Sequence, residues 1–493
     1  MKALSTIAKG AGFVFLGMVV SKFLSYLYRV VIASLGPAEY GLLSIGLAVF
    51  GMLSVLSVLG LDTGVVRYLS EYKSKKDFSS VAGTVVGALK TSLFVSFFIG
   101  AALFLFAPFL ATVIFHSNAL VLLLRFFAVM IPFYAARDIM LAAVRAATQE
   151  SYFDVIVRNV GENTLKLIFT FLLIGFGAVG AVSATAGALF VSFLFALYFC
   201  LRYIPYSPGA EQKLHLLQYS IPLLFSTLLI QIFVWSGTLI MGYYRSPAEV
   251  GIFNAALPTA KLLSIIPGGI GSLFLPVMTE LYTQHKELEA RTTYLAATKW
   301  IFFMNLPIYV IIMAFAQPLL SLIFGAEYGA GALALAIVAT SYLLLQAALP
   351  SIETLKALKK TPLVLLDTGV AAVLCIVLSF LLVPQYGVTG GALATGLSFA
   401  AYGGLAIIQA YGSTRIFAFQ LHFLKGIFAA AAAWFVVQWF FPPATSLSLL
   451  LGGAITIGLV YTMLIILFRS LSEEDKIILG KVQNKVKAFL PEF

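Results

Sequence analysis

Seven basic residues lie inside the long apolar runs of this sequence, where charged side chains are rare: Lys22, Arg29, Lys90, Arg125, Arg137, Lys166 and Lys261. Each lysine or arginine costs about 2.5–3.5 kcal/mol at the centre of a membrane-spanning helix. Seven of them facing lipid would cost on the order of 20 kcal/mol, more than the usual stability of a folded protein, about 5–15 kcal/mol. Some must therefore face water, a partner charge or a ligand. A cationic interior suits an anionic ligand, for example a phosphate or diphosphate group.

The spacing of two of these residues is informative. Lys22 and Arg29 are seven residues apart, which places them on one face of a helix, and Ser25 and Tyr26 lie between them on the same side. Arg29 has no carboxylate near it in the sequence. It therefore contacts either an anionic ligand or an acidic residue on another helix.

Three other basic residues lie near a span end: Lys90, Arg125 and Lys166. A long basic side chain in such a position can extend its charged group to the membrane surface, so each of these either lines a cavity or reaches the interface. In the second half of the chain, Asn254 and Lys261 share a helical face. A further polar stripe there is formed by Gln231, Trp235 and Thr238.

Acidic residues are fewer in the apolar runs: Asp62, Asp138, Glu162 and Asp367. The first three are candidates for binding a coupling proton or sodium ion. Asp138 is adjacent to Arg137, and local pairing is its simplest interpretation. Glu162 belongs to an alternating-sign stripe with Arg158 and Lys166, spaced by four residues, which is either structural or part of a cavity wall. If the chain moves an anionic ligand across the membrane, the membrane potential acting on that ligand could drive the transport without an ion site.

The composition indicates which elements position these residues. The chain is 61% hydrophobic and 10% charged, whereas soluble globular chains are about 45–50% apolar and about 25% charged. At roughly 35 residues for a span and its loop, the length allows about 14 helices. We therefore predict an all-α polytopic membrane protein with spans near 11–34, 41–65, 81–106, 120–145, 156–176, 179–201, 216–242, 250–276, 296–324, 331–354, 363–383, 388–410, 421–441 and 446–468.

The loops between these spans differ in charge. The side that holds both termini carries 23 lysines and arginines, with Arg158 and Lys299 counted among them, against Arg245 alone on the other side. The positive-inside rule then places both termini in the cytoplasm, which predicts a multi-pass protein of the plasma membrane. The same distribution explains the net charge of +11, so we expect no nucleic-acid partner.

Metal or redox chemistry is not indicated. Cys200 and Cys375 lie in apolar runs, and neither they nor the four histidines have ligand spacing. A glycine-rich phosphate loop and a nucleophile–base arrangement are also absent from the sequence. We therefore expect no metal, no cofactor and no enzymatic activity. We interpret the first apolar run as a retained span rather than a signal peptide.

Short matches recur 210 residues apart. Pro-Ala-Glu-Tyr-Gly at 37–41 matches Pro-Ala-Glu-Val-Gly at 247–251, and Gly177 matches Gly387 in the same register. Two landmarks in one register indicate an internal repeat of six spans. Because six is even, both copies cross the membrane in the same orientation, as in parallel-repeat transporters. The predicted units are an N-lobe (1–208), a C-lobe (209–418), two final spans (419–470) and a cytoplasmic amphipathic tail (471–493).

Two stretches carry a family resemblance. Residues 28–41 (Tyr-Arg-Val-Val-Ile-Ala-Ser-Leu-Gly-Pro-Ala-Glu-Tyr-Gly) resemble the first-span signature of the polysaccharide transporter family. These are the Wzx-like lipid-linked oligosaccharide flippases of the multidrug/oligosaccharidyl-lipid/polysaccharide (MOP) superfamily. Residues 59–72 resemble the end of that family's second span. The resemblance implies two six-helix lobes in a V around a central cavity, with alternating access. The pair Lys22 and Arg29 is similar in kind to that of the peptidoglycan-precursor branch but differs by about one residue in spacing.

The resemblance and the cationic interior together favour a transporter over an enzyme. We expect a flippase that moves a polyprenyl-diphosphate-linked oligosaccharide or polysaccharide precursor from the inner to the outer leaflet, for the cell envelope. The alternative is a multidrug or organic-cation antiporter of the same superfamily, which would need carboxylates to dominate the cavity. A membrane glycosyltransferase or polymerase is less favoured, because it would need a sizeable external loop. The expected partners are the anionic lipid-linked glycan, membrane lipids and glycan-assembly enzymes.

Overall fold

The computed structural model describes residues 2–75, 77–148, 152–204, 213–421, 423–441 and 445–468. Every secondary-structure element in this part of the chain is a helix, which confirms the all-α polytopic fold. The predicted amphipathic tail at 471–493 lies outside the described residues. The α-helices are α1 (Lys2–Ala33), α2 (Pro37–Val58), α3 (Leu61–Ser74), α4 (Phe78–Phe109), α5 (Leu120–Thr148), α6 (Tyr152–Asp154), α7 (Glu162–Leu173), α8 (Gly177–Tyr203), α9 (Lys213–Tyr244), α10 (Pro247–Ala260), α11 (Ile265–Thr283), α12 (Glu287–Ala314), α13 (Ala316–Ile323), α14 (Ala332–Ala347), α15 (Leu349–Ala357), α16 (Thr361–Thr414), α17 (Phe423–Phe440) and α18 (Leu447–Leu467). Short π- or 3-10-helical turns separate some of them: η1 (Leu110–Ile114), η2 (Val155–Gly161), η3 (Ile174–Phe176), η4 (Lys261–Ser264) and η5 (Ala326–Gly331).

Twelve helical segments within the described residues are long and apolar enough to cross a membrane. Two of them are hairpins rather than single crossings. The segment 152–203 turns at Gly177, whose φ is +65°, and α16 turns at Gly387, whose φ is +51°. Glycine adopts such backbone angles without a steric penalty. With both hairpins counted as two crossings, the described chain crosses fourteen times, as the hydropathy pattern predicts.

The sequence also determines where several helices begin. Pro37 and Pro247 occupy the first position of α2 and α10, where proline loses no helical hydrogen bond. The side chains of Asp77, Ser246 and Ser446 accept hydrogen bonds from backbone N–H groups in the first turns of α4, α10 and α18. Such caps satisfy donors that have no partner within the helix. The connections between crossings are therefore short and well defined at these points.

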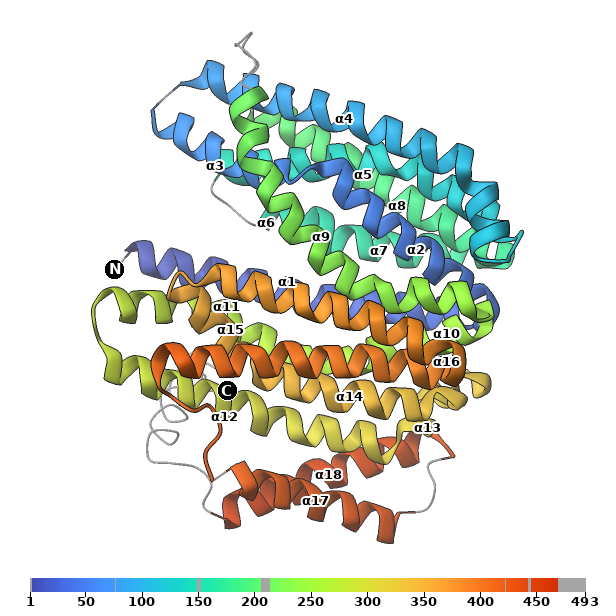
Figure 1. Cartoon of the computed structure of the whole chain (residues 1–493), viewed down its shortest axis with the longest axis vertical. Helices are drawn as coiled ribbons and strands as arrows, with labels where there is room; N and C mark the ends of the chain where they lie inside the picture. The colour runs from blue at the N-terminus through green and yellow to red at the C-terminus, as the bar shows by residue number, and fades with distance from the viewer. Residues whose placement is uncertain are drawn as a thin grey trace, which may run out of the picture.

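The helices form two groups (Figure 1). Helices α2 to α8 make up the upper group and α10 to α16 make up the lower group, with α17 and α18 packed on its far side, while α1 and α9 lie between the two groups. Helix α9 contacts α2 and α3 of the upper group and α16 of the lower group, and α1 contacts α7 as well as α10 and α11. Both helices thus belong to the contact between the groups. The lobe boundaries at residues 208 and 418 stay a prediction.

The two ends of the helix bundle differ in charge. We call the end at which α1 begins the basic end, because it carries a set of exposed cations in α3 and in the turns between helices: Arg67, Lys75, Lys286, Lys359 and Arg415. Arg245 lies at the opposite end. Several of the basic residues that the sequence analysis counted with the loops lie in helices, among them Arg158 within η2 and Lys299 within α12. The excess of positive charge at the basic end persists without these two.

Helices α2 and α10 cross near the opposite end, and their first turns are the two Pro-Ala-Glu-x-Gly copies. Gly41 lies against the backbone carbonyl of Pro247, and Gly251 lies against that of Pro37, so the contact is reciprocal. A Cβ atom on either glycine would overlap the facing carbonyl. Small residues allow helix backbones to approach this closely. The repeated sequence is therefore also the contact that joins the two helix groups.

Each copy of the repeat also contacts the hairpin turn of its own half. Glu39 accepts a hydrogen bond from the backbone N–H of Ala178, immediately after the first hairpin glycine. In the second half, the Glu249 carboxylate lies beside Gly387, and Arg245, just before the second copy, donates to the carbonyls of Val383 at 3.0 Å and Pro384 at 2.7 Å. In each half, the Pro-Ala-Glu-x-Gly segment therefore lies next to the hairpin glycine, the other landmark of the 210-residue repeat.

Candidate functional site

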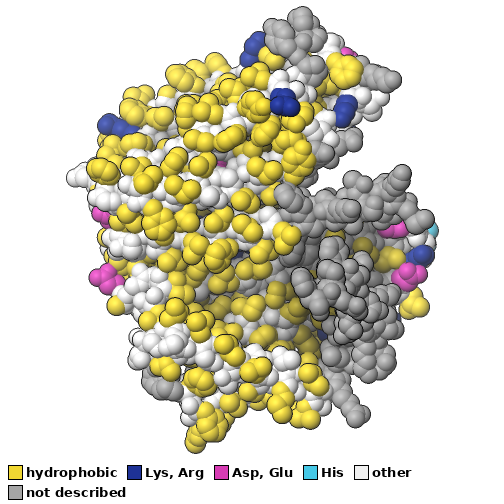
Figure 2. All heavy atoms as spheres, turned by 180° about the vertical axis from the view of Figure 1, so that it is seen from behind, with side chains coloured by type: hydrophobic (Ala, Val, Ile, Leu, Met, Phe, Trp, Pro, Cys, Tyr) yellow, Lys and Arg dark blue, Asp and Glu magenta, His cyan; other side chains and the backbone are white. Residues whose placement is uncertain are grey.

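A cavity of about 340 Å³ lies between the two helix groups. Its walls come from α1, α7, α9, α10, η4, α11, α14 and α16. Figure 2 shows the molecule from behind, with hydrophobic side chains covering most of that face and a notch where the groups separate. An apolar outer face is what the hydrocarbon core of a membrane requires.

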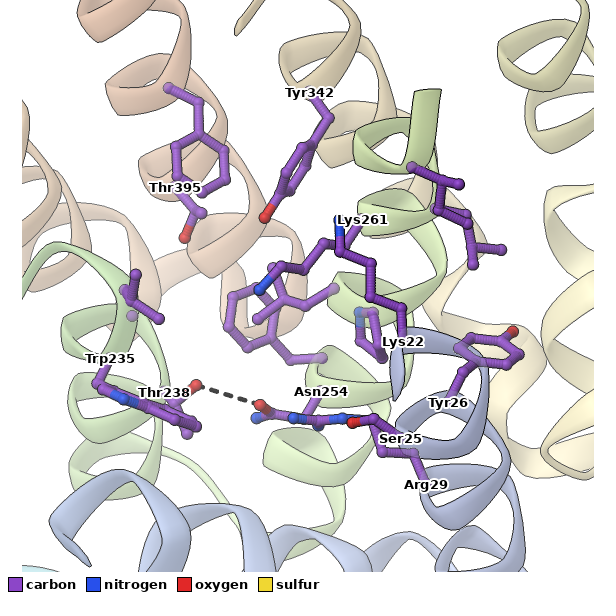
Figure 3. Close-up of a pocket in the computed structure, with 18 of the residues that line it drawn as sticks. Lys22, Ser25, Tyr26, Arg29, Trp235, Thr238, Asn254, Lys261, Tyr342 and Thr395 are labelled. Carbon is purple, nitrogen blue, oxygen red and sulfur yellow. Dashed lines mark hydrogen bonds between the residues drawn. The ribbon is translucent and has the colours of Figure 1, made fainter. Parts of the chain in front are cut away.

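Three of the seven basic residues meet in this cavity: Lys22, Arg29 and Lys261. Lys22 and Arg29 lie on the same side of α1, as their spacing predicts. Lys261 comes from η4, a tight turn that follows Pro258 near the end of α10. Proline interrupts the regular helix because it lacks a backbone donor. The stems of Lys22 and Lys261 extend into the cavity (Figure 3).

The protein supplies these cations with few partners. Lys22 Nζ donates to the carbonyl and the hydroxyl of Ser264, each at 3.2 Å, and Arg29 Nη1 donates to the phenol oxygen of Tyr40 at 3.3 Å. No Asp or Glu side chain lines the cavity in the part of the chain that the structure describes. Lys261 lies close enough to Lys22 and Arg29 for their charges to repel it. A cavity with three positive charges and no counter-ion attracts an anion.

The rest of the cavity wall is uncharged. Thr238 Oγ1 donates to Asn254 Oδ1 at 3.2 Å (Figure 3). Trp235 and Tyr342 present aromatic rings, and the hydroxyl of Thr395, a residue only 6% exposed, points into the cavity. Trp235, Thr238 and Asn254 belong to polar faces that the sequence shows. Tyr342 and Thr395 were missed because a hydroxyl in an apolar helix has no distinctive spacing.

Between the cavity and the opposite end of the bundle lie two buried tyrosines, one of which contacts Arg29. Tyr40 and Tyr328 are each 1% exposed. Tyr40 donates to the carbonyl of Asn254 at 3.0 Å, and Tyr328 donates to the carbonyl of Ala33 at 2.9 Å. The first bond joins the two helix groups through α2 and α10, and the second joins the end of α1 to η5 of the lower group.

Arg137 and Lys166 lie in a separate ionic cluster within the upper helix group. The guanidinium of Arg137 is 2% exposed, and it contacts Asp138 at 2.8 Å and also Glu162. Lys166 Nζ lies 3.9 Å from Glu162, and Arg158 Nη1 lies 3.9 Å from Asp138. The local pairing of Arg137 with Asp138 is therefore present. Two of the carboxylates considered for ion coupling serve as partners of this arginine, and they offset two of the cluster's three positive charges.

The remaining candidates point elsewhere. Lys90 is exposed on α4, at the outer edge of the upper group in Figure 1. The guanidinium of Arg125 lies 5.0 Å from the ring centre of Phe104. Asp62 lies in the first turn of α3, near enough to Asp138 for their charges to interact. None of these side chains lines the cavity. The assignment of the predicted residues to substrate binding and ion coupling stays a prediction.

Two family models match the chain. The model described as "polysaccharide biosynthesis protein" matches residues 7–282, which is more than half of the chain. The model named MatE matches residues 222–381, within the second half.

Solved structures and a curated relative are similar to the chain. Lipid II flippase MurJ in an inward closed conformation superposes with a TM-score of 0.73 at 16% identity, over 93% of this chain and 99% of that one. An inward-facing multidrug resistance MATE family transporter of the MOP superfamily gives 0.67 at 17% identity, over 80% and 94%. At such identities the likeness establishes the fold alone. A relative from Haloferax volcanii, named a probable low-salt glycan biosynthesis flippase, Agl15, is 22% identical over 166 residues, 34% of this chain and 35% of its own.

Proposed function

This chain belongs to the polysaccharide biosynthesis protein family, and we propose that it is a flippase for a polyprenyl-diphosphate-linked oligosaccharide or polysaccharide precursor. It moves this substrate from the inner to the outer leaflet of the plasma membrane. The observation that carries the proposal is the charge of the cavity, which Lys22, Arg29 and Lys261 line without a described carboxylate. The names of MurJ, a lipid II flippase, and Agl15, a glycan biosynthesis flippase, support the substrate class.

The cationic part of the cavity suits a diphosphate. The planar guanidinium of Arg29 can hold two phosphate oxygens at once, while Lys22 and Lys261 add point charges. The present acceptor of Arg29 is the neutral phenol oxygen of Tyr40. A phosphate oxygen is a stronger acceptor for a guanidinium than a phenol, so the substrate can take this bond over.

The uncharged part of the cavity suits sugars. The hydroxyls of Thr395 and Tyr342 and the amide of Asn254 can exchange hydrogen bonds with sugar hydroxyls, and the ring of Trp235 offers a flat apolar surface. These groups share the cavity with the cations (Figure 3), so a diphosphate and its first sugar fit it together. A polyprenyl chain does not fit within about 340 Å³ as well, and it stays in the surrounding hydrocarbon.

We place the basic end of the bundle in the cytoplasm, following the positive-inside rule. The helix groups are joined at the opposite end by the α2–α10 crossing and separate toward the basic end (Figure 1). In this conformation the cavity would load from the inner leaflet. Rocking of the two groups about the crossing would then expose it to the outer leaflet, as in other transporters built from repeats.

The second candidate function is that of a multidrug antiporter. It is favoured by the MatE match over 222–381 and by the similarity to a MATE family transporter. An organic cation would be repelled by Lys22, Arg29 and Lys261, and no described acidic residue in the cavity wall offsets them. The charge of the cavity therefore favours the flippase.

Binding of the two ligand classes to the purified full chain distinguishes the candidates. We expect saturable binding of a polyprenyl diphosphate carrying one sugar, weakening as salt rises because the contact is ionic. Tetraphenylphosphonium, an organic cation, should not bind. The Arg125→Ala variant is the matched control, because it removes a basic residue of a span outside the cavity. Binding of the cation and not of the diphosphate would reject the flippase in favour of the antiporter.

A further inference from the structure

A buried carboxyl group in the second half of the chain has an unpaired oxygen. Asp367, in the first limb of α16 (361–386), is 0% exposed. Its Oδ1 accepts a hydrogen bond of 2.6 Å from Nε2 of Gln409, in the second limb (388–414). Two buried oxygens at this contact have no partner, Asp367 Oδ2 and Gln409 Oε1. While the carboxyl is ionised they cannot bond to each other, because both are acceptors.

We propose that Asp367 carries a proton on Oδ2 and donates it to Oε1 of Gln409. The two side chains then form a cyclic acid–amide pair, in which the amide N–H donates to Oδ1 and the acid O–H donates to Oε1. One proton satisfies both unpaired atoms and removes a buried negative charge, which is costly inside a membrane. The ligand of this site is the proton, and the site lies outside both the cationic cavity and the ionic cluster of the upper group.

The helices packed against Asp367 do not neutralise it. The described side chains of α9 and α14 include no charged residue. On α15, Glu353 and Lys356 pair with each other at 2.8 Å. Tyr402, in the second limb, is a titratable group within electrostatic range of Asp367, and it is neutral when protonated. A carboxylate at this position would thus remain without a counter-ion.

A proton suits the site better than a metal ion. Sodium, like other hard cations, needs several oxygen ligands around it. Here the amide N–H of Gln409 already points at one carboxylate oxygen of Asp367, and an N–H donor cannot ligate a cation. The bond that this geometry lacks is a single O–H···O bond.

The site lies near the basic end, where a proton can exchange with water. Asp367 is six residues from the start of α16, about 9 Å along the helix. Closer to the end, Lys360 Nζ donates to Ser413 Oγ at 2.9 Å and holds the bases of the two limbs together. Loss of the proton leaves two acceptors facing each other, which pushes the limbs apart or admits water. Protonation and the spacing of the limbs are therefore linked.

Infrared difference spectroscopy of the purified full chain, between neutral and alkaline pH, tests the proposal. The wild type should show the carbonyl band of a protonated carboxyl group and lose it at alkaline pH. Asp367→Asn should lack this band at every pH and still fold, because asparagine keeps a neutral side chain of the same size beside Gln409. Glu353→Gln is the control and should keep the band, since it removes a carboxyl group that contacts Lys356 and lies outside the Asp367–Gln409 pair. Gln409→Leu should shift the band to higher frequency, because the acid loses its acceptor.

Four results would overturn the proposal. A band that survives in Asp367→Asn belongs to another residue, and a missing band in the wild type at neutral pH means that Asp367 is ionised. A rise of the wild-type Tm with sodium chloride but not with choline chloride, absent in Asp367→Asn, would identify the ligand as sodium. If Asp367→Asn does not accumulate, the test rests on Gln409→Leu. A carbonyl band at the wild-type frequency in that variant would show that Asp367 does not donate to Gln409.

Discussion

Replacing Arg29 by alanine removes the guanidinium that we expect to hold the diphosphate. A hydrogen bond to a charged group contributes about 1.5–3 kcal/mol, and 1.4 kcal/mol corresponds to a tenfold change in affinity. Loss of one such bond therefore weakens binding by about 10- to 150-fold, and loss of two weakens it further. Arg29→Lys keeps the charge but not the planar fork, so its affinity and its flipping activity should fall between those of Arg29→Ala and the wild type.

The same substitution should leave the amount of folded protein unchanged. Within the described residues, Arg29 donates to Tyr40 at 3.3 Å, and Tyr40 keeps its own bond to the Asn254 carbonyl when Arg29 is absent. The lost bond has a charged donor and costs about 1.5–3 kcal/mol. Removing a cation from the membrane interior offsets this, by about 2.5–3.5 kcal/mol on insertion scales. Binding and folding can therefore be separated at this residue.

The assay measures lipid-linked oligosaccharide accumulating in the inner leaflet of cells whose only copy of the gene carries the variant. Binding of a sugar-bearing polyprenyl diphosphate to the purified variant gives the affinity. Arg125→Ala serves as the control, since Arg125 stacks on Phe104 away from the cavity. Wild-type flipping and affinity in Arg29→Ala, at normal abundance, would refute the assignment of this helix face to the head group. An equal loss of flipping and affinity in Arg29→Ala and Arg125→Ala would show that any basic residue in a span has this effect. That result would also refute the assignment of this helix face to the head group.

Two other predictions follow from the positions of charged and exposed residues. Cysteines introduced at Ser246 and Glu327 should react with an impermeant external reagent, and one at Ser74 should not. All three positions are exposed, but Ser74 lies at the basic end, which we place in the cytoplasm. The reverse labelling pattern would mean that the basic end faces outward. Arg137→Ala should destabilise the protein in denaturation measurements by about 3–5 kcal/mol, because Asp138 and Glu162 lose their buried partner and keep only contacts of 3.9 Å to Arg158 and Lys166. Adding Glu162→Gln to Arg137→Ala should restore part of this loss, and an additive loss would argue against the cluster.

Much of the fold could be predicted because the membrane restricts the choices. Backbone polar groups have no water to bond in hydrocarbon, so an apolar run of sufficient length must be a helix. The turns at Gly177 and Gly387 could be placed from their shared register in the repeat. What the sequence does not show is that the Pro-Ala-Glu-x-Gly copies face each other, because a contact across 210 residues depends on how the helices cross. Arg158 and Lys299 were placed in loops because they are charged, but a charged residue alone does not end a helix.

The site was predictable where its geometry is local. Lys22 and Arg29 share one helix, and seven residues are two helical turns. Lys261 reaches the same cavity through the turn after Pro258, and its meeting with α1 depends on tertiary packing. The same limit applies to Asp367, which is visible as an acidic residue near a span start. Its partner Gln409 follows 42 residues later, and only the register of the α16 hairpin brings the two together.

The two sets of cations inside the membrane differ in how far acidic residues balance their charge. Around Arg137, the acidic residues Asp138 and Glu162 lie within contact distance of the bases, and Arg158, which is 42% exposed, is the member of the cluster that reaches solvent. Around Arg29, the described cavity wall has cations and no acids. A balanced cluster contributes to stability and needs nothing from outside, whereas an unbalanced one lowers stability unless an anion or water offsets its charge. In the sequence both groups look alike, as basic residues among polar neighbours in apolar runs. Their different charge balances, which only the tertiary contacts define, are the reason that we propose substrate binding in the cavity and a structural role for the cluster.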